Sequence, residues 1–279
     1  MEKTMKHMET ARILSQTEIL DGIWDMRLEA PEAAALAVPG QFVNLYLPDA
    51  ARILPRPISL CGIDAEKGIL RLVYRVSGGG TQELAAMKAG AALRMMGPLG
   101  NGFPLEEAAG RRVTLIGGGI GIPPLLEMAR VLHESEGVTG KDSDGELRMQ
   151  PTHVTGVLGY RSKTFLVPEF ASYGDVMIAT EDGSTGTKGN VLDALRENGC
   201  VPEIIFACGP LPMLRALKAF AVEKQIPCWI SMEERMACGI GACLACVCKT
   251  TEVDGHSHVR NARVCTDGPV FRAEQLDLG

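Results

Sequence analysis

The sequence predicts an antiparallel β-barrel, then an α/β domain built on a parallel sheet, and a short cysteine-rich segment at the C-terminal end. Three observations support this fold class. Short β-rich segments alternate with turn residues in the first third of the chain, strands alternate with helices in the middle, and the last part has little periodicity but several cysteines. We therefore predict three parts, residues 1–108, 109–232 and 233–279, and the 279 residues are enough to build them.

The first part has the pattern of an antiparallel barrel. Six segments are rich in β-formers or alternate apolar with polar residues, and turn dipeptides such as Asp21-Gly22 and Pro39-Gly40 separate them. Six short strands favour closure into a barrel, with Thr81–Lys88 as its one helix. The expected strands are Arg12–Ile19, Ile23–Glu29, Gln41–Leu47, Ile58–Ile63, Leu70–Val76 and Ala92–Met96.

The second part changes to alternating strands and helices, which indicates a Rossmann-like parallel sheet with right-handed crossovers. Between its first helix and its second strand, Gly137–Thr152 is polar and rich in glycine, and we expect a solvated loop there. The expected strands are Val113–Ile116, Val154–Gly159, Asp175–Thr180, Ile204–Ala207 and Cys228–Ser231. The expected helices are Pro123–His133, Asn190–Asn198 and Pro210–Lys224.

Charge and hydropathy argue against several classes of function. The formal net charge of −6 disfavours nucleic acid or an anionic membrane as the partner, because both attract basic surfaces. Met1–Thr10 is charged and has no apolar stretch, so we expect no secretory signal. The most apolar segment, Val113–Leu132, is interrupted by glycines, prolines, Glu127 and Arg130, which favours a buried strand and helix over a membrane span. We expect a cytoplasmic protein.

The third part carries the most specific pattern of the chain. Cys238, Cys243 and Cys246 are spaced C-x4-C-x2-C, and Cys265 follows after a longer gap, which is the plant-type spacing for a [2Fe–2S] cluster. The residues between the first three cysteines are mostly glycine and alanine, so the backbone can bend tightly and approach the sulfurs. So short a segment cannot bury enough apolar area alone, and a bound metal centre would stabilise it.

A structural zinc site is the main alternative for these cysteines. Zinc sites usually pair two C-x2-C knuckles, but here only Cys243 and Cys246 have that spacing, and Cys265 has no close partner in the sequence. An iron–sulfur cluster is therefore favoured, with a zinc-stapled, nucleotide-binding redox sensor as the alternative of another class. Cys248 is an additional candidate that we leave out of the ligand set.

A glycine-rich turn follows the first strand of the second part and opens its first helix. Gly117, Gly118, Gly119 and Gly121 would let the backbone approach a pyrophosphate at the helix N-terminus. Pro124 stands where a full G-x-G-x-x-G motif has its third glycine, so a plain strand-to-helix turn remains the alternative.

Two further segments end strands of the same sheet. Cys208-Gly209-Pro210 ends a later strand, and because the carboxyl ends of parallel strands form the ligand crevice, it should face the same nucleotide. Thr180–Ser184 ends the third strand and either contacts the nucleotide or forms a plain polar loop. Arg161 could hold a 2′-phosphate or be a surface charge; we expect NAD rather than NADP.

Three motifs of the barrel suit a ligand with a diphosphate and a flat ring. An arginine fork such as that of Arg56 suits a diphosphate, the hydroxyl of Ser59 can donate to a ring nitrogen, and Tyr74 can stack on a ring. Taken singly, the same residues could be a surface charge, a turn residue and a core aromatic. The motifs are Arg56-Pro57-Ile58-Ser59, Val73-Tyr74-Arg75 and Gly79-Gly80-Thr81.

In their order along the chain, Arg56–Ser59, Gly117–Pro123 and Cys208–Pro210 resemble the ferredoxin–NADP reductase superfamily. The tail, with Glu233–Cys243 and Val264–Phe271, is similar to the electron-transfer subunit of class 1B dihydroorotate dehydrogenase. The resemblance covers residues 11–272 and is most specific in the cysteine segment.

The resemblance implies three cofactors. It implies FAD on the barrel, with Arg56 at the diphosphate and Ser59 near the flavin N5, and NAD on the second part, with its nicotinamide near Cys208. The implied FAD residues are Arg56, Pro57, Ile58, Ser59, Val73, Tyr74, Arg75, Gly80 and Thr81. The implied NAD residues are Gly117, Gly118, Gly119, Gly121, Cys208, Gly209 and Pro210, and the cluster ligands are Cys238, Cys243, Cys246 and Cys265.

The resemblance also implies a partner, an FMN-carrying catalytic subunit that oxidises dihydroorotate to orotate in pyrimidine synthesis, with two copies of each subunit assembled. A cluster moves one electron and NAD accepts a hydride, so a flavin must stand between them, and the expected order is FMN, cluster, FAD, NAD. No catalytic side chain is expected in this chain. The small subunit of an NADPH–ferredoxin oxidoreductase or of a sulfide dehydrogenase remains an alternative.

Overall fold

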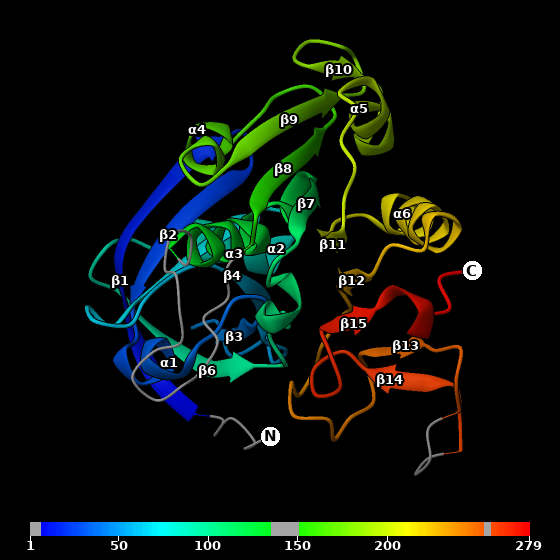
Figure 1. The fold of residues 1–279 in the computed structure, drawn as a ribbon. Coiled ribbons are helices and arrows are strands. Elements are labelled where there is room, and N and C mark those ends of the chain that lie inside the picture. The colour runs from blue at the N-terminus through cyan, green and yellow to red at the C-terminus, as the bar shows by residue number, and fades with distance from the viewer. Residues whose placement is uncertain (1–6, 135–150, 254–257) are drawn as a thin grey trace, which may run out of the picture. The chain divides into compact units, whose positions relative to one another are not determined.

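The computed structural model describes residues 7–134, 151–253 and 258–279, and the chain divides into two compact units (Figure 1). The first unit comprises Met1–Gly102 and Met232–Val270, and the second comprises Phe103–Ser231 and Phe271–Gly279. Most of the cysteine-rich segment therefore groups with the N-terminal part of the chain. The division into 1–108, 109–232 and 233–279 stays a prediction, and residues 137–150 of the expected solvated loop lie outside the described residues.

The first unit contains the predicted barrel. Six strands close it in the order β1-β2-β5-β4-β3-β6, and each pair of neighbours is antiparallel. Each of the six expected strands has a counterpart, so the antiparallel barrel is confirmed. The strands are β1 (His7–Leu20), β2 (Ile23–Glu29), β3 (Phe42–Tyr46), β4 (Arg56–Asp64), β5 (Ile69–Arg75) and β6 (Ala92–Leu99).

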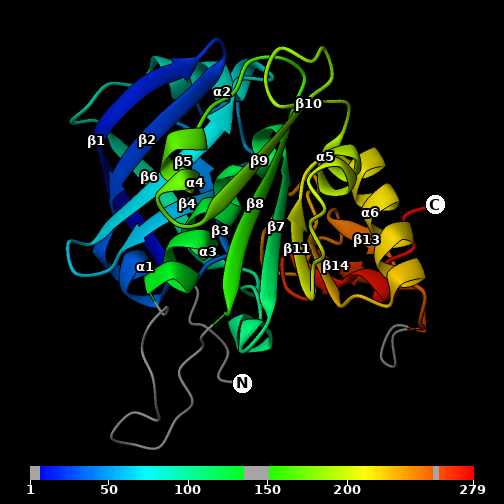
Figure 2. The same ribbon diagram turned by 45° about the horizontal axis from the view of Figure 1, so that its top comes forward.

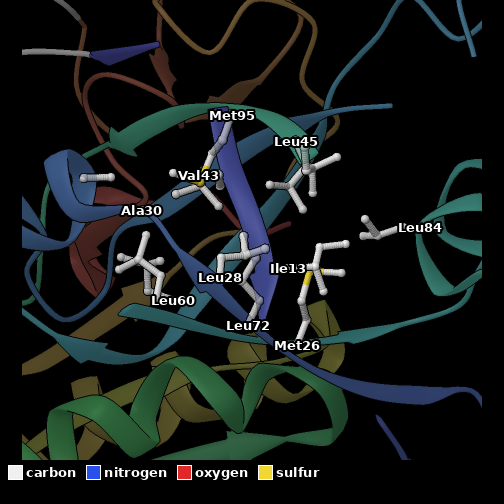
Figure 3. Packing of buried hydrophobic residues seen from close by; sticks show 14 of the residues in the cluster. Ile13, Met26, Leu28, Ala30, Val43, Leu45, Leu60, Leu72, Leu84 and Met95 are labelled. Carbon is white, nitrogen blue, oxygen red and sulfur yellow. The ribbon is translucent and has the colours of Figure 1, made fainter. Parts of the chain in front are cut away.

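Apolar side chains from alternate strand positions fill the barrel (Figure 3). Ile13, Met26, Leu28, Leu45 and Leu72 are all fully buried in this core. Successive side chains on a strand point to opposite faces, so the residues between these positions face away from the core. Since burying one such side chain is worth about 1.5–3 kcal/mol, the alternation provides much of the driving force for closing the barrel.

Two helices accompany the barrel, although the sequence predicted only one. α2 (Gly79–Ala86) corresponds to the expected Thr81–Lys88 and starts earlier, because the hydroxyl of Thr81 accepts hydrogen bonds from the backbone just before the helix. α1 (Pro31–Leu36) was not expected. Its six residues are too few to show a helical period, and it buries Ala33.

The second unit is built on a seven-stranded sheet in the order β10-β9-β8-β7-β11-β12-β15. The pairs from β10 to β12 are parallel, which confirms the Rossmann-like sheet. The strands are β7 (Arg112–Gly118), β8 (His153–Tyr160), β9 (Asp175–Thr180), β10 (Thr187–Lys188), β11 (Ile204–Cys208), β12 (Cys228–Ser231) and β15 (Val270–Arg272).

Helices cover both faces of this sheet. Figure 2 shows α3 and α4 on one side and α5 and α6 on the other, as in a doubly wound fold. The sequence did not predict α4, β10 or β15, each of which has five residues or fewer. The helices are α3 (Pro123–Glu134), α4 (Val167–Ala171), α5 (Val191–Glu197) and α6 (Leu211–Lys224).

The cysteine-rich segment has little regular structure of its own. β13 (Val247–Lys249) pairs antiparallel with β14 (Asn261–Arg263), and Cys248 lies in this hairpin opposite Ala262. The rest of the segment up to β13 is formed by bends and turns. Across the described ranges of the chain, no helix combines the length and the apolar character needed to cross a membrane.

Candidate cofactor-binding sites

The four predicted cluster ligands lie in one unit and form two pairs. Cys238 interacts through its side chain with Cys243, and Cys265 does so with Cys246. Among the described residues, no three His, Cys, Asp or Glu side chains already converge as ligands of a single metal ion. The spacing of these cysteines along the chain, C-x4-C-x2-C, is the observation that favours an iron–sulfur cluster over zinc.

Glycines shape the loop between the first two cysteines. Gly239 and Gly241 have φ values of 71° and 83°, a conformation that side-chain-bearing residues rarely adopt. The backbone N–H groups of Ile240 and Cys243 each donate to the Sγ of Cys238, at 3.4 Å. The loop therefore presents N–H donors to a sulfur, an arrangement that tunes the potential of iron–sulfur clusters.

Cys238 and Cys265 differ in their proton affinity. Burial raises the pKa of Cys238, but hydrogen bonds from the backbone N–H groups of Ile240 and Cys243 outweigh it and lower the pKa to about 6. Cys238 is therefore a thiolate at neutral pH, the form that binds metal. Burial, and then interaction with Cys246, raises the pKa of Cys265 to about 12. A metal ion deprotonates a thiol that coordinates it, so the raised pKa of Cys265 is compatible with its being a ligand. The donor set fits an iron–sulfur cluster.

Five cysteines remain outside the predicted ligand set, and four of them are buried. Cys61, Cys208 and Cys228 are buried, as expected for small core residues. Cys248 is also buried, and this burial raises its pKa to about 11, so it is a neutral thiol at physiological pH. Its position in the hairpin agrees with leaving it out of the ligand set.

Arg56 lies over the start of α2 in the barrel unit. Its guanidinium occupies the space that a side chain at Gly80 would need, and its Nη1 donates to the carbonyl oxygen of Leu54 at 2.8 Å. The first N–H groups of a helix and a guanidinium both bind anions. The structure thus brings Arg56 and Gly80 together in an arrangement that fits a diphosphate.

A second arginine at this helix end, Arg52, was missed by the sequence reasoning. The Cβ position of Gly79 lies 2.8 Å from its Nη1, and its Nε forms a salt bridge with Glu83 at 2.8 Å. The available signal was an arginine four residues before Arg56, combined with two glycines at the start of a helix. Two guanidinium groups over two glycines make this end of α2 a candidate anion site.

The position of Tyr74 bears on the expectation that its ring could stack on a flat ligand. Its side chain is fully buried in the barrel core, and its hydroxyl donates to Oε1 of Gln16 at 3.1 Å. The structure favours the alternative interpretation of Tyr74 as a core aromatic over ring stacking, because the alternation of β5 turns Leu70, Leu72 and Tyr74 inward. Only the backbone of Tyr74 is left to contact a cofactor, and Val73 lies on the outer face.

The other barrel positions are divided between the core and the outer surface. Ile58 packs against the core from β4, so its neighbours Pro57 and Ser59 face outward. Arg75 is exposed at the end of β5. Thr81 holds the loop before α2, because its hydroxyl also donates to the carbonyl oxygen of Gly78 at 3.0 Å.

The two glycine-containing turns of the second unit meet where the strand order reverses. β7 and β11 are neighbours, and Cys208 is paired with Gly117. A side chain at Gly121 would overlap the carbonyl group of Cys208, and one at Gly118 would approach Pro210 to 2.8 Å. The structure therefore brings Gly117–Gly121 and Cys208–Pro210 together at the switch point, where open α/β sheets bind ligands.

The same contacts give these glycines a structural role. Gly118 and Gly121 are needed so that the two turns can pack backbone against backbone. Pro123 and Pro124 open α3 and have no N–H group, so this helix start offers fewer donors to a phosphate than usual. Dinucleotide binding at these glycines stays a prediction that the position of the turns supports.

The loop after β9 is held by its own contacts. Thr180 Oγ1 donates to the carbonyl oxygen of Thr185 at 2.8 Å, and the N–H of Ser184 donates to Asp182 at 2.9 Å. Hydrogen bonds from Ser184 lower the pKa of Asp182. These contacts agree with a plain polar loop, and Arg161 beside it is exposed.

Comparison with protein families identifies the C-terminal segment. Residues 233–277 match the family described as the iron–sulfur cluster binding domain of dihydroorotate dehydrogenase B. Over its whole length the chain is similar to curated proteins. It is 42% identical to the dihydroorotate dehydrogenase B (NAD⁺) electron transfer subunits of Bacillus cereus and Bacillus anthracis, over 98% of this chain and 100% of each relative.

Solved structures show the same fold. The structure of an NADH-dependent reduced ferredoxin–NADP oxidoreductase, described for flavin-based electron bifurcation, has a TM-score of 0.79 and 30% identity over 96% of this chain and 90% of that chain. A ferredoxin NADP⁺ reductase from Neisseria gonorrhoeae with bound FAD and NADP has a TM-score of 0.60 over 77% of this chain and 91% of that chain. At 14% identity, the second likeness concerns the fold alone.

Proposed function

Because the chain belongs to the family of dihydroorotate dehydrogenase B electron-transfer subunits, we propose that it carries electrons from the FMN of a catalytic partner, through a [2Fe–2S] cluster and FAD, to NAD⁺. The chain is then the electron-transfer component of an oxidoreductase of pyrimidine biosynthesis. The observation that carries the proposal is the loop of paired cysteines, which lies in the segment matched by the family's iron–sulfur domain. Two copies of each subunit would assemble.

In this proposal each part of the chain holds one cofactor. Residues 233–279 bind the cluster through Cys238, Cys243, Cys246 and Cys265, and residues 1–108 hold the FAD diphosphate between Arg56 and the start of α2. Residues 109–232 bind NAD at the turns after β7 and β11. FAD supplies the exchange between one-electron and two-electron transfer. The side chains bind and orient the cofactors, and none has to act as a general acid or base.

The proposal places the complex in the cytoplasm. Four cysteines, Cys238, Cys243, Cys246 and Cys265, would be needed as reduced thiolates to hold the cluster. Free thiols persist in reducing compartments, whereas oxidising ones favour disulfides.

Anaerobic co-purification with the native catalytic partner tests the function. We expect two irons, two acid-labile sulfides and one FAD per chain, together with NAD⁺ reduction driven by dihydroorotate. Colourless, zinc-loaded protein would instead favour the redox sensor. A complex that has cluster and flavin but does not respond to dihydroorotate would favour a ferredoxin or sulfide oxidoreductase.

Exposed apolar residues beside the cysteines support a docking role for this loop. Leu244 follows the exposed Cys243 and is itself 61% exposed, and Ile240 in the same loop is 46% exposed. Exposed apolar groups near a redox centre suit a partner that must approach that centre closely. The loop is therefore the proposed contact surface for the catalytic subunit.

Leu244→Asp is expected to weaken binding of the catalytic subunit about tenfold or more, because a charge would replace an apolar contact at the interface. Val222→Asp is the matched control, since Val222 is a similarly exposed aliphatic residue on α6, at 59%. The dissociation constant is measured by calorimetry or biolayer interferometry with cluster-loaded protein. Equal affinities of the two variants would remove this loop from the interface.

A further inference from the structure

Asn44 lies in an unusual position in the middle of β3. Its neighbours Val43 and Leu45 point into the barrel core (Figure 3). Because strand side chains alternate, Asn44 points to the outer face of the barrel, yet its side chain is 0% exposed. Another part of the first unit therefore covers it.

The cover is the cysteine loop. A side chain at Gly239, directly after Cys238, would overlap Nδ2 of Asn44, so the amide nitrogen lies against the loop backbone. Tyr46, two residues along the same face of β3, interacts electrostatically with Cys238. Asn44 and Tyr46 thus lie beneath the first cysteine of the cluster motif.

The amide of Asn44 is buried without a hydrogen-bond partner. Neither its Nδ2 nor its Oδ1 bonds to any residue that the structure describes. A buried polar group that is left unpaired is costly, and native proteins keep few of them. The amide lies at the edge of a proposed cofactor site. Its missing hydrogen-bond partner would therefore be an atom of the bound cofactor.

Gln41, just before β3, shows that this part of the barrel can satisfy a buried amide. Its side chain is 1% exposed, donates to the carbonyl oxygen of Gly100 at 2.8 Å and accepts from the N–H of Val38 at 2.9 Å. Both ends of the Gln41 amide are paired within the barrel. This part of the barrel can therefore supply hydrogen-bond partners to a buried side-chain amide. The amide of Asn44 has none among the described residues, which indicates a different role from that of Gln41.

We propose that Asn44 donates a hydrogen bond from Nδ2 to a sulfur at the Cys238 end of the bound cluster. The inference rests on the proposed cluster site. An N–H donor stabilises the sulfur of a reduced cluster more than that of an oxidised one, because reduction adds negative charge. Asn44 therefore raises the reduction potential of the cluster and favours acceptance of electrons from the partner.

Potentiometric titration of the complex with the catalytic partner, followed by electron paramagnetic resonance of the reduced cluster, tests this role. Asn44→Leu keeps the approximate volume and removes the donor, and Asn44→Asp keeps the shape and replaces the donor with an acceptor. Both variants should lower the equilibrium constant for one-electron reduction of the cluster about tenfold, which corresponds to a reduction potential lower by about 59 mV. The shift in Asn44→Asp should be at least as large as that in Asn44→Leu.

Gln41→Leu is the matched control, because it removes a buried amide whose partners are all in the barrel. It should lower the thermal midpoint of unfolding and leave the cluster potential unchanged, whereas the Asn44 variants should shift the potential and retain their flavin. Flavin content and the flavin absorbance spectrum are recorded for each protein.

Three results would overturn the inference. One is an unshifted cluster potential in Asn44→Leu, and another is a wild-type potential in Asn44→Asp, which would make the amide an acceptor. The third is a shift confined to the flavin, which would assign Asn44 to FAD. If the wild-type complex itself gave no cluster signal, the proposed function would fail first, so the two failures are distinguishable.

Discussion

Cys243→Ser is expected to abolish electron transfer between this chain and its catalytic partner, while NADH oxidation by an artificial acceptor through FAD survives. Cys243 is the exposed member of the pair with Cys238, and its backbone N–H also donates to the Sγ of Cys238. Serine is not deprotonated at neutral pH and is a poor replacement for a thiolate. Losing an outer-shell partner of a metal site costs about 10–100-fold, so losing a ligand should reduce partner-linked turnover by more than about 100-fold.

Cys248→Ser is the control for this experiment. Cys248 lies in the same segment, but it is buried in the β13–β14 hairpin and carries a raised pKa. Its replacement should leave iron content and turnover near the wild-type values. The two activities are measured on the same preparations, with dihydroorotate and NAD⁺ for the complete route and with NADH and a dye for the flavin alone. Partner-linked turnover that persists in Cys243→Ser would refute the relay.

Arg56→Ala is expected to raise the dissociation constant of FAD about 100-fold. The guanidinium lies over Gly80 at the start of α2, where it can form two charge-assisted hydrogen bonds with a diphosphate. Each such bond is worth about 1.5–3 kcal/mol, and every 1.4 kcal/mol is a factor of about ten, so losing the pair costs about 100-fold or more. Flavin fluorescence during dilution or ultrafiltration gives the dissociation constant, and the iron content should not change.

Arg52→Ala is the control that distinguishes a specific contact of Arg56 with FAD from a non-specific effect of positive charge on FAD binding. Arg52 has the same side chain over the neighbouring Gly79, but it is engaged in salt bridges with Glu83 at 2.8 Å and Asp49 at 3.5 Å. Its removal should weaken FAD binding less than tenfold, because partly exposed, already paired charges contribute about 0–1 kcal/mol. If the two variants lose FAD equally, the site is a diffuse positive patch, and Arg56 has no special position in it.

Most of the fold could be predicted from local patterns. Ile23–Glu29, Asp175–Thr180 and Cys228–Ser231 have the predicted limits, because alternation or a buried run between turn residues fixes where a strand can lie. The short elements could not be predicted. α1 and β10 contain too few residues to show a period, and they form because neighbouring strands offer them a surface to pack against or to pair with.

The candidate sites were predictable to different degrees. The candidate cysteine ligands could be proposed from the sequence, because three of them come from one short loop and residues close in the sequence are then close in space. For Tyr74 the sequence left two interpretations open, because one strand residue can serve either the core or a ligand, and only the register of β5 decides which face it takes. Arg52 was missed because its position over Gly79 depends on how two distant segments meet.

Local sequence determines the order of strands and helices, the glycine turns and the cysteine spacing, because each depends on residues within a few positions of one another. Long-range contacts decided the remainder. That Asn44 is covered by Gly239, and that Gly121 packs against Cys208, follows from which strands and loops become neighbours. Such contacts join residues separated by many positions, and they arise only when the apolar faces of all the strands are buried together.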